Sequence, residues 1–134
     1  MITEDAHATE TFGREWAKTL LPGTVVALHG DLGAGKTTLV KGIVSELTGT
    51  PPQQISSPTF TLMHLYESKY PVYHFDLYRL KSAEEFVHSG FTDFFDSVGI
   101  CLIEWPDRIT PILPKNTVHI HLTHLEQGGR QIDV

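Results

Sequence analysis

The stretch that decides the fold is Gly30-Asp31-Leu32-Gly33-Ala34-Gly35-Lys36-Thr37-Thr38. It matches the pattern G-x-x-x-x-G-K-[ST], which is typical of a loop whose backbone amides wrap around phosphate groups. The glycines permit the tight, partly positive-φ path that such a loop needs, and no side chain obstructs it. Lys36 is placed to neutralise the outer phosphates of a nucleotide, and Thr37 offers a hydroxyl to a magnesium ion.

The segments on either side of this loop are typical of a strand and a helix. Val25 to Leu28 is a short apolar run, as expected of a strand buried on both faces. After the loop, apolar side chains recur at helical spacing until Gly49, which favours the end of a helix. Such a helix directs the positive end of its dipole at the phosphates. The flanking segments therefore favour a nucleotide-binding loop over a glycine-rich turn without a ligand.

Length and composition indicate one domain that spans residues 1–134. The formal net charge of −6 argues against unaided adhesion to nucleic acid or to an anionic membrane. Cys101 is the only cysteine and lies in an apolar run, which favours a buried thiol in a reducing compartment. No stretch approaches the roughly 20 apolar residues of a membrane helix, and the N-terminus is too polar for a secretory signal. We therefore expect a cytoplasmic protein.

The rest of the chain predicts an α/β protein with its ligand at the carboxyl ends of the strands. No internal repeat or low-complexity tract interrupts the pattern. The predicted elements are a helix capped by Asp5 and ended by Pro22-Gly23, a hairpin of strands 59–66 and 71–76, a short helix with a Ser82/Glu85 capping box, a buried strand over 99–105, a Pro-rich loop over 106–114, and strands over 117–125 and 130–134.

Two carboxylates follow apolar runs and are candidates for the chemistry of the site. Glu104 ends Ile100-Cys101-Leu102-Ile103, so a buried strand would carry it to the sheet edge where the phosphate loop lies. A nucleotide hydrolase needs such an acid near the magnesium ion or its waters, although an ordinary surface glutamate also fits the pattern. Asp76 ends the predicted hairpin in a similar way and is a candidate for orienting water.

Several other side chains have a functional and an ordinary interpretation. Thr59 follows the first helix where a mobile loop could sense a γ-phosphate, but it also suits the start of a strand. Trp105 offers a face for a base or a partner, or packs at the sheet edge. Arg79, Arg108 and Arg130 are candidate charge stabilisers or solvated surface residues. The histidines at 119, 121 and 124 suggest a metal, but strand alternation and the lack of nearby Cys or carboxylate favour a half-exposed strand.

Four segments together, GDLGAGKTT, SSPTFTL, YHFDLYRL and CLIEWPDR, extend beyond a generic phosphate loop. In residue identity and spacing they resemble the TsaE (YjeE) family of bacterial ATPases, and the resemblance runs from about Asp5 to Arg130. The resemblance implies a P-loop NTPase-like fold with a central, mostly parallel sheet, an inserted hairpin and helices on both faces. It further implies ATP and Mg²⁺ as cofactors and a part in the threonylcarbamoyladenosine modification beside the tRNA anticodon. Its implied partners are TsaB and TsaD, with tRNA contacted only through their complex and no membrane.

The same resemblance implies roles for individual residues. Gly33, Ala34, Gly35, Lys36, Thr37 and Thr38 match the phosphate-binding loop, and Thr37 with Glu104 matches the Mg²⁺ positions. Asp76, Trp105 and Arg130 match further functional positions, and Thr9 resembles a family residue near the nucleotide base. Lys36, Asp76 and Glu104 are the expected catalytic residues. Family members usually continue past the position of Val134, so we expect a C-terminal extension to be missing from this sequence.

We therefore expect a weak Mg²⁺-dependent ATPase that acts on a TsaB–TsaD complex and does not itself transfer the threonylcarbamoyl group. No serine or cysteine stands in a recognisable nucleophile motif. The alternatives are a small-molecule kinase, a regulatory GTPase and a nucleotide-gated binding module without turnover. The chain is short for a kinase acceptor pocket and lid, and it lacks an N-K-x-D guanine-reading motif.

Overall fold

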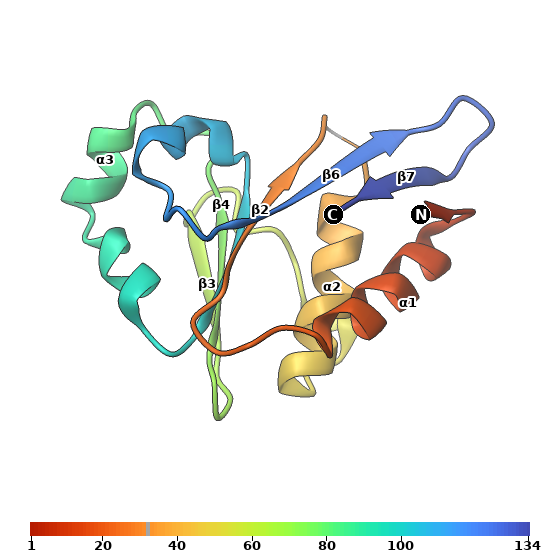
Figure 1. Ribbon diagram of the computed structural model, residues 1–134, viewed down its shortest axis with the longest axis horizontal. Coiled ribbons are helices and arrows are strands. Elements are labelled where there is room, and N and C mark those ends of the chain that lie inside the picture. The colour runs from red at the N-terminus through yellow and green to blue at the C-terminus, as the bar shows by residue number, and fades with distance from the viewer. Residues whose placement is uncertain (32) are drawn as a thin grey trace.

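The computed structural model describes residues 1–31 and 33–134, so Leu32 of the loop lies outside the described residues. The described residues form a seven-stranded sheet in the order β1-β7-β6-β2-β5-β4-β3, with helices on both faces (Figure 1). The strands are β1 (Ile2–Thr3), β2 (Val25–His29), β3 (Met63–Tyr66), β4 (Val72–Asp76), β5 (Ile100–Glu104), β6 (Val118–His124) and β7 (Arg130–Asp133).

The four central strands, β6, β2, β5 and β4, run parallel, and antiparallel strands complete both edges. β3 and β4 form the predicted inserted hairpin, with Met63 opposite Phe75. Every residue of β5 is buried, as its continuous apolar run predicted. The predicted α/β class, with a central parallel sheet, is confirmed.

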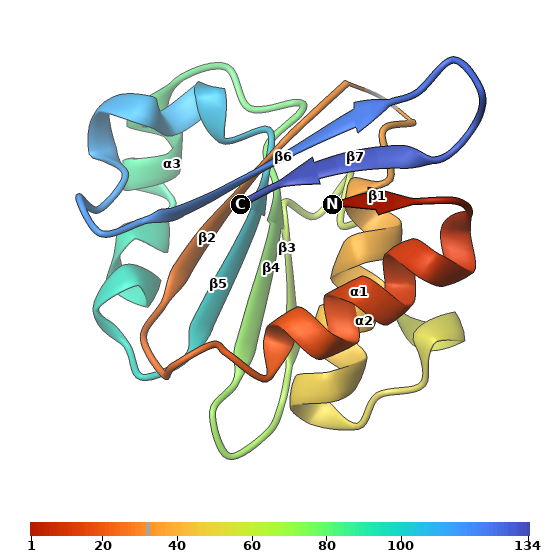
Figure 2. The same cartoon turned by 45° about the vertical axis from the view of Figure 1, so that its right-hand side comes forward.

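Helices cover the two faces of the sheet in separate groups (Figure 2). One face carries α2 (Lys36–Thr48), with α1 (Ala6–Ala17) packed against it. The other face carries α3 (Ala83–His88) and the 3₁₀ segments η2 (Phe91–Asp96) and η3 (Pro106–Ile112); a further 3₁₀ turn, η1 (Pro52–Gln54), follows α2. The predicted caps form: the Asp5 carboxylate accepts from the amide of Ala8, the Ser82 hydroxyl accepts from Glu85, and Gly49 ends α2 with φ 77°.

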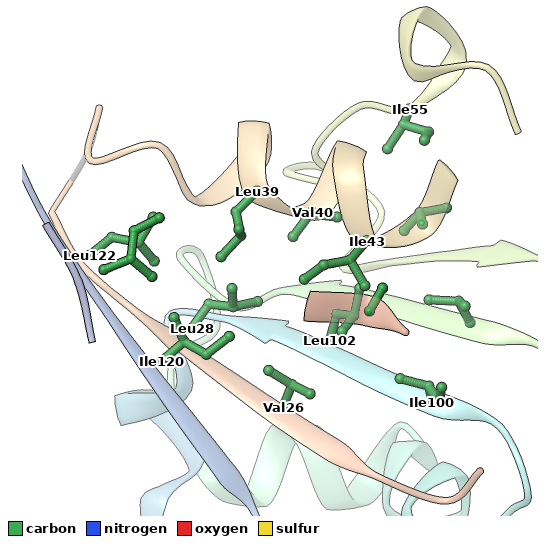
Figure 3. Packing of buried hydrophobic residues seen from close by; sticks show 14 of the residues in the cluster. Val26, Leu28, Leu39, Val40, Ile43, Ile55, Ile100, Leu102, Ile120 and Leu122 are labelled. Atoms are coloured by element: carbon green, nitrogen blue, oxygen red, sulfur yellow. The ribbon is translucent and has the colours of Figure 1, made fainter. Parts of the chain in front are cut away.

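The sheet separates two hydrophobic cores. On the α2 face, aliphatic side chains from the strands interdigitate with those of the helix, among them Leu28, Leu102 and Ile43 (Figure 3). The opposite core is aromatic, and Phe75 and Phe86 in it are fully buried with ring centroids 5.5 Å apart. Because both faces are packed, the ends of β2, β4 and β5 are held at fixed relative positions.

Some predicted boundaries were wrong. β3 begins at Met63, not at Thr59, because Pro58 to Leu62 forms a turn in which the amide of Leu62 donates to Pro58 and Leu62 takes φ 67°. α1 ends at Ala17, ahead of Pro22, because the next amides bond three residues back. The Pro-rich segment over 106–114 contains the 3₁₀ turns of η3, and the short β1 was not predicted.

Candidate functional site

The phosphate loop, the carboxyl ends of the parallel strands and the C-terminal hairpin surround one pocket of about 340 Å³. It contains most of the predicted site residues together with one that was not predicted. The lining consists of Gly33, Gly35, Lys36, Thr37 and Thr38 from the loop and α2, Ser57 and Thr59 from the following segment, Asp76 and Glu104 from strand ends, Trp105, and Arg130 from β7.

Strand register places the two carboxylates beside the loop. In the parallel pairs, Glu104 lies opposite Leu28 of β2 and opposite Asp76 of β4. β2 continues directly into Gly30, so the loop and both acids leave the sheet at the same edge. Glu104 and Asp76 are 3% and 5% exposed, which makes their environments poor in solvent.

Lys36 begins α2 and lies within the pocket. Gly35 before it takes φ 100°, a conformation that glycine adopts without the steric cost that a side chain brings. The Lys36 ammonium donates to the carbonyl of Gly30 and lies 3.5 Å from the centroid of the Trp105 ring. Burial lowers the pKa of Lys36, while the nearby carboxylates of Glu104 and Asp76 act in the opposite direction.

Trp105 has an unusual backbone conformation. It takes the left-handed conformation, φ 59° and ψ 51°, directly after β5. Such a conformation is disfavoured for a bulky residue and occurs where the surrounding structure enforces it. Its ring packs against Tyr78 at 5.0 Å between centroids as well as against Lys36.

Thr37 and Glu104 present oxygen atoms to each other, as a shared cation site requires. The Thr37 hydroxyl lies 3.4 Å from Glu104 Oε1, and the second carboxylate oxygen, Oε2, lies 2.6 Å from Nε2 of His74. A hydroxyl and a carboxylate are the hard oxygen donors that Mg²⁺ accepts when phosphates and water complete its coordination. The donor set therefore fits this ion.

Asp76 is held by donors from three positions. Its Oδ2 accepts from the hydroxyls of Ser57 at 2.5 Å and Thr59 at 3.4 Å, and its Oδ1 accepts from the amide of Tyr78 at 3.0 Å. Thr59, a candidate sensor in the sequence, therefore faces an acid of the pocket. The carboxylate is oriented firmly enough to align a water molecule.

Arg130 reaches the loop from the far end of the chain. Its guanidinium donates to the carbonyls of Gly33 at 3.0 Å and Gly129 at 2.8 Å. The arginine side chain lies 3.4 Å from where a Cβ on Gly35 would stand, so the hairpin and the loop are in close contact. The hairpin thereby forms one wall of the pocket.

Four of the predicted residues do not line this pocket. Thr9 is 1% exposed inside α1, and its hydroxyl bonds to Thr3 at 2.6 Å, so the structure does not bring it to this pocket. The Arg79 guanidinium lies over the ring of Phe60 at 4.4 Å. Arg108 lies 3.5 Å from Asp107 and donates to the carbonyl of Tyr78. Ala34 of the loop is buried, and its amide donates to the carbonyl of Asp31.

The histidines of β6 follow the predicted alternation. His119 and His121 are exposed while Ile120 and Leu122 are buried, and both imidazoles stack on His29. Burial lowers the pKa of His29, and its two histidine neighbours act in the same direction. Within residues 1–31 and 33–134, no group of three or more His, Cys, Asp or Glu side chains could hold a metal ion.

None of the helices that the structure describes could cross a membrane, because none is sufficiently long and apolar.

Two residues of the site were not identified from the sequence. Ser57 precedes a proline in a turn-rich segment, where serine is common for local reasons. His74 is fully buried beside Glu104, and its signal was an ionisable residue inside an otherwise apolar strand, two positions before Asp76. The pocket thus joins a loop of the phosphate-binding sequence pattern, a hydroxyl–carboxylate pair that fits Mg²⁺ and an oriented carboxylate.

Comparisons with known proteins show which family and which fold this chain resembles. A family model described as "Threonylcarbamoyl adenosine biosynthesis protein TsaE" matches residues 3–132. A protein of Treponema pallidum (strain Nichols), named tRNA threonylcarbamoyladenosine biosynthesis protein TsaE, is 40% identical over 133 residues, which cover 99% of this chain and 97% of that protein. A protein of the same name from Haemophilus influenzae is 40% identical over 131 residues, covering 92% and 81%.

A crystal structure of Bacillus subtilus YdiB superimposes with a TM-score of 0.77 and 32% identity, covering 98% of this chain and 80% of that one. The chain has the P-loop NTPase-like fold that its resemblance to the TsaE family implied. Because the family model spans nearly all of its residues and its relatives are similar over most of their lengths, the chain belongs to the TsaE family.

Proposed function

We propose that this protein binds and hydrolyses ATP with Mg²⁺ in the biosynthesis of threonylcarbamoyladenosine in tRNA. The observation that carries the proposal is the Thr37–Glu104 pair, which presents two hard oxygen donors beside Lys36 at the start of α2. The family and the names of the relatives support the biosynthetic role. The proposed role in tRNA modification supports a cytoplasmic location.

Each residue of the pocket has a defined task in this proposal. Lys36 and the amides of the loop hold the phosphates, and the N-terminus of α2 favours their negative charge. Thr37 and Glu104 would hold Mg²⁺, and the ion would supply positive charge against the negative charge that develops on the phosphate oxygens. Asp76 orients the attacking water through a carboxylate that Ser57, Thr59 and Tyr78 fix in place.

Hydrolysis by the isolated protein should be slow. Arg130 is the one arginine among the described residues that line the pocket, and its guanidinium is engaged with the carbonyls of Gly33 and Gly129. An arginine free to stabilise the transferring phosphoryl group contributes roughly 10³- to 10⁵-fold in related NTPases. We infer that TsaB and TsaD complete the site or release Arg130, and that tRNA acts only through their complex.

The protein does not transfer the threonylcarbamoyl group in this proposal. Acyl transfer through the enzyme would need an activated nucleophile, and the thiol of Cys101 is 1% exposed. Burial raises the pKa of Cys101 to about 12, which keeps it in the unreactive thiol form. ATP turnover would instead reset the TsaB–TsaD complex between cycles.

The deciding experiment measures ATP turnover by the protein alone, with TsaB and TsaD, and with tRNA added. We expect slow turnover alone and a clear stimulation by the two partners. No stimulation under any condition would contradict the proposal and favour a binding module without turnover. Phosphoryl transfer to an added small molecule would instead favour a kinase, and tighter binding of GTP than of ATP a GTPase.

The Lys36→Ala variant tests the phosphate-binding assignment. Removal of a charge-assisted contact of about 1.5–3 kcal/mol should weaken ATP binding by roughly 10- to 100-fold in calorimetric titration. Lys115→Ala is the matched control, because Lys115 is exposed and lies outside the pocket. Equal ATP affinities in the two variants would refute the assignment.

A further inference from the structure

His74 is an imidazole enclosed in an apolar strand. Its side chain is fully buried in β4, between Tyr73 and Phe75 in the sequence, and it shares the α2 face of the sheet with Asp76. The parallel register places it opposite Leu102, two residues before Glu104. An aliphatic side chain at this position would pack without a polar atom, so the imidazole requires a separate reason.

The hydrogen bond to Glu104 fixes which ring nitrogen carries the proton. A carboxylate only accepts hydrogen bonds, so Nε2 of His74 donates to Glu104 Oε2, 2.6 Å away. The other ring nitrogen, Nδ1, is buried and has no hydrogen-bond partner among the described residues. With the proton on Nε2, the buried Nδ1 carries only a lone pair, and an unpaired lone pair costs less than an unpaired N–H. The arrangement therefore favours the tautomer protonated on Nε2.

This contact divides the two oxygens of Glu104 between two tasks. Oε2 is occupied by His74, while Oε1 faces the Thr37 hydroxyl at 3.4 Å. Without the imidazole, rotation about the last bond of the glutamate side chain would be limited only by packing and by the long contact with the Thr37 hydroxyl. Ligands of metal ions are commonly held by such a second hydrogen bond, which orients the oxygen that meets the metal.

We propose that His74 is a positioning residue, which holds Oε1 of Glu104 toward Thr37 and so prepares the Mg²⁺ site. The proposal rests on the proposed function, since it concerns the cation site of the same pocket. It adds a third residue, from a third element, to a site that otherwise consists of one side chain from α2 and one from β5.

The first test compares ATP affinity in EDTA with ATP affinity in saturating Mg²⁺, by calorimetry on the intact chain. In the parent protein Mg²⁺ should strengthen binding. In His74→Leu the strengthening should fall by roughly 10- to 100-fold, as for loss of other groups that orient metal ligands, while affinity in EDTA stays near the parent value. His88→Leu is the matched control, because His88 is an exposed histidine of α3.

Two amide variants separate positioning from packing. The side-chain nitrogen of glutamine reaches as far as Nε2 of histidine, whereas that of asparagine reaches only as far as Nδ1. His74→Gln should therefore recover most of the Mg²⁺ effect and His74→Asn should not, although both bury an amide at the same place. An equal Mg²⁺ effect on ATP affinity in the two variants would overturn the proposal. This comparison remains decisive even if His74→Leu does not fold.

Heteronuclear NMR of the histidine side chains gives a readout that needs no metal. In the metal-free parent we expect a proton on Nε2 of His74 that exchanges slowly with solvent. In Glu104→Ala this proton should exchange rapidly. A parent in which only Nδ1 carries a proton would overturn the proposal. A parent protein whose ATP binding ignores Mg²⁺ would overturn the proposed function and this role with it. A Mg²⁺-dependent parent whose His74→Leu variant keeps the full dependence would overturn the role of His74 alone.

Discussion

Asp76 collects hydrogen bonds from side chains that the sequence places far before it. Ser57 and Thr59 both donate to Oδ2, and the amide of Tyr78 donates to Oδ1. These hydrogen bonds fix the plane of the carboxylate. At the residue scale, Asp76 is therefore the group best prepared to accept a hydrogen bond from an attacking water.

The Asp76→Asn variant should retain ATP binding and lose turnover. The amide keeps the shape of the carboxylate but cannot accept a proton or orient water in the same way, so we expect stimulated hydrolysis to fall about 10²-fold or more. Turnover with TsaB and TsaD, beside a calorimetric ATP titration, measures both effects. Asp93→Asn, at an exposed acid of η2, serves as control. Undiminished turnover in Asp76→Asn would remove Asp76 from the mechanism.

Cys101 gives a pH dependence with a definite sign. Burial raises the pKa of its thiol from 9.0 to about 12. Below pH 9.0 the thiol is protonated in both the folded and the unfolded chain, so burial of Cys101 contributes its full stabilisation. Between these two values the unfolded chain loses its proton first, so stability falls as pH rises, by about 1.4 kcal/mol per pH unit.

Cys101→Ala should lack this decline. In urea unfolding, the parent should lose about 1 kcal/mol more than the variant between pH 9.0 and about one unit above it, although the variant is less stable overall because of the cavity it creates. Other groups that titrate in this range, Tyr66 among them, are common to both proteins. Parallel pH profiles would show that the thiol is not held in a low-dielectric site.

At the scale of elements, the two helices on one face of the sheet approach each other through glycines. A Cβ on Gly42 of α2 would stand 2.1 Å from the carbonyl oxygen of Glu10 in α1, and a Cβ on Gly13 of α1 would stand 2.6 Å from that of Leu39. Both clashing atoms belong to the backbone of a helix and cannot move away as a flexible side chain could. The distance between α1 and α2 is therefore set by the absence of side chains at these two positions.

Gly42→Ala should destabilise the protein in spite of the helix propensity of alanine. Propensity alone favours alanine by about 1 kcal/mol in a helix interior, but the clash should outweigh it and cost about 1–3 kcal/mol net. Thermal or urea unfolding measures the sign directly. Glu46→Ala, at an exposed position of α2, should show the propensity effect alone. A stabilised Gly42→Ala protein would mean that the helices separate at little cost.

At the scale of the whole molecule, both ends of the chain converge on the phosphate loop. β1 pairs with β7, with Thr3 opposite Arg130, and Arg130 reaches the carbonyl of Gly33. Thr9 of α1 bonds through its hydroxyl to Thr3, so it fixes the strand that in turn borders Arg130. The contact of Thr9 with the nucleotide base stays a prediction, and the structure shows a link from Thr9 through Thr3 to the pocket wall.

Thr9→Val distinguishes these two roles. Loss of the hydroxyl leaves that of buried Thr3 without its partner, which should cost about 1–3 kcal/mol of unfolding free energy. ATP affinity of the folded protein should stay near the parent value. Thr11→Val, at an exposed position of α1, is the control. A variant of unchanged stability with weakened ATP binding would instead support a direct contact of Thr9 with the base.

The sequence alone determined the local parts of this protein. The loop from Gly30 to Thr38 and its flanking strand and helix follow from glycine conformation and hydrophobic periodicity, which act over a few residues. Glu104 and Asp76 were identifiable because each ends an apolar strand. The start of β3 at Met63 and the 3₁₀ turns of η3 were missed, because short turns of this kind leave no hydrophobic periodicity in the sequence.

Only the tertiary structure decided which distant residues meet at the pocket. Arg130 reaches Gly33 across 97 positions of sequence, Glu104 meets Thr37 across 67, and His74 meets Glu104 across 30. No local pattern encodes these distances, because they result from the order of strands in the sheet and from the packing of both its faces. Periodicity specifies which face of a strand is buried, whereas the register between strands specifies which side chains of that face touch.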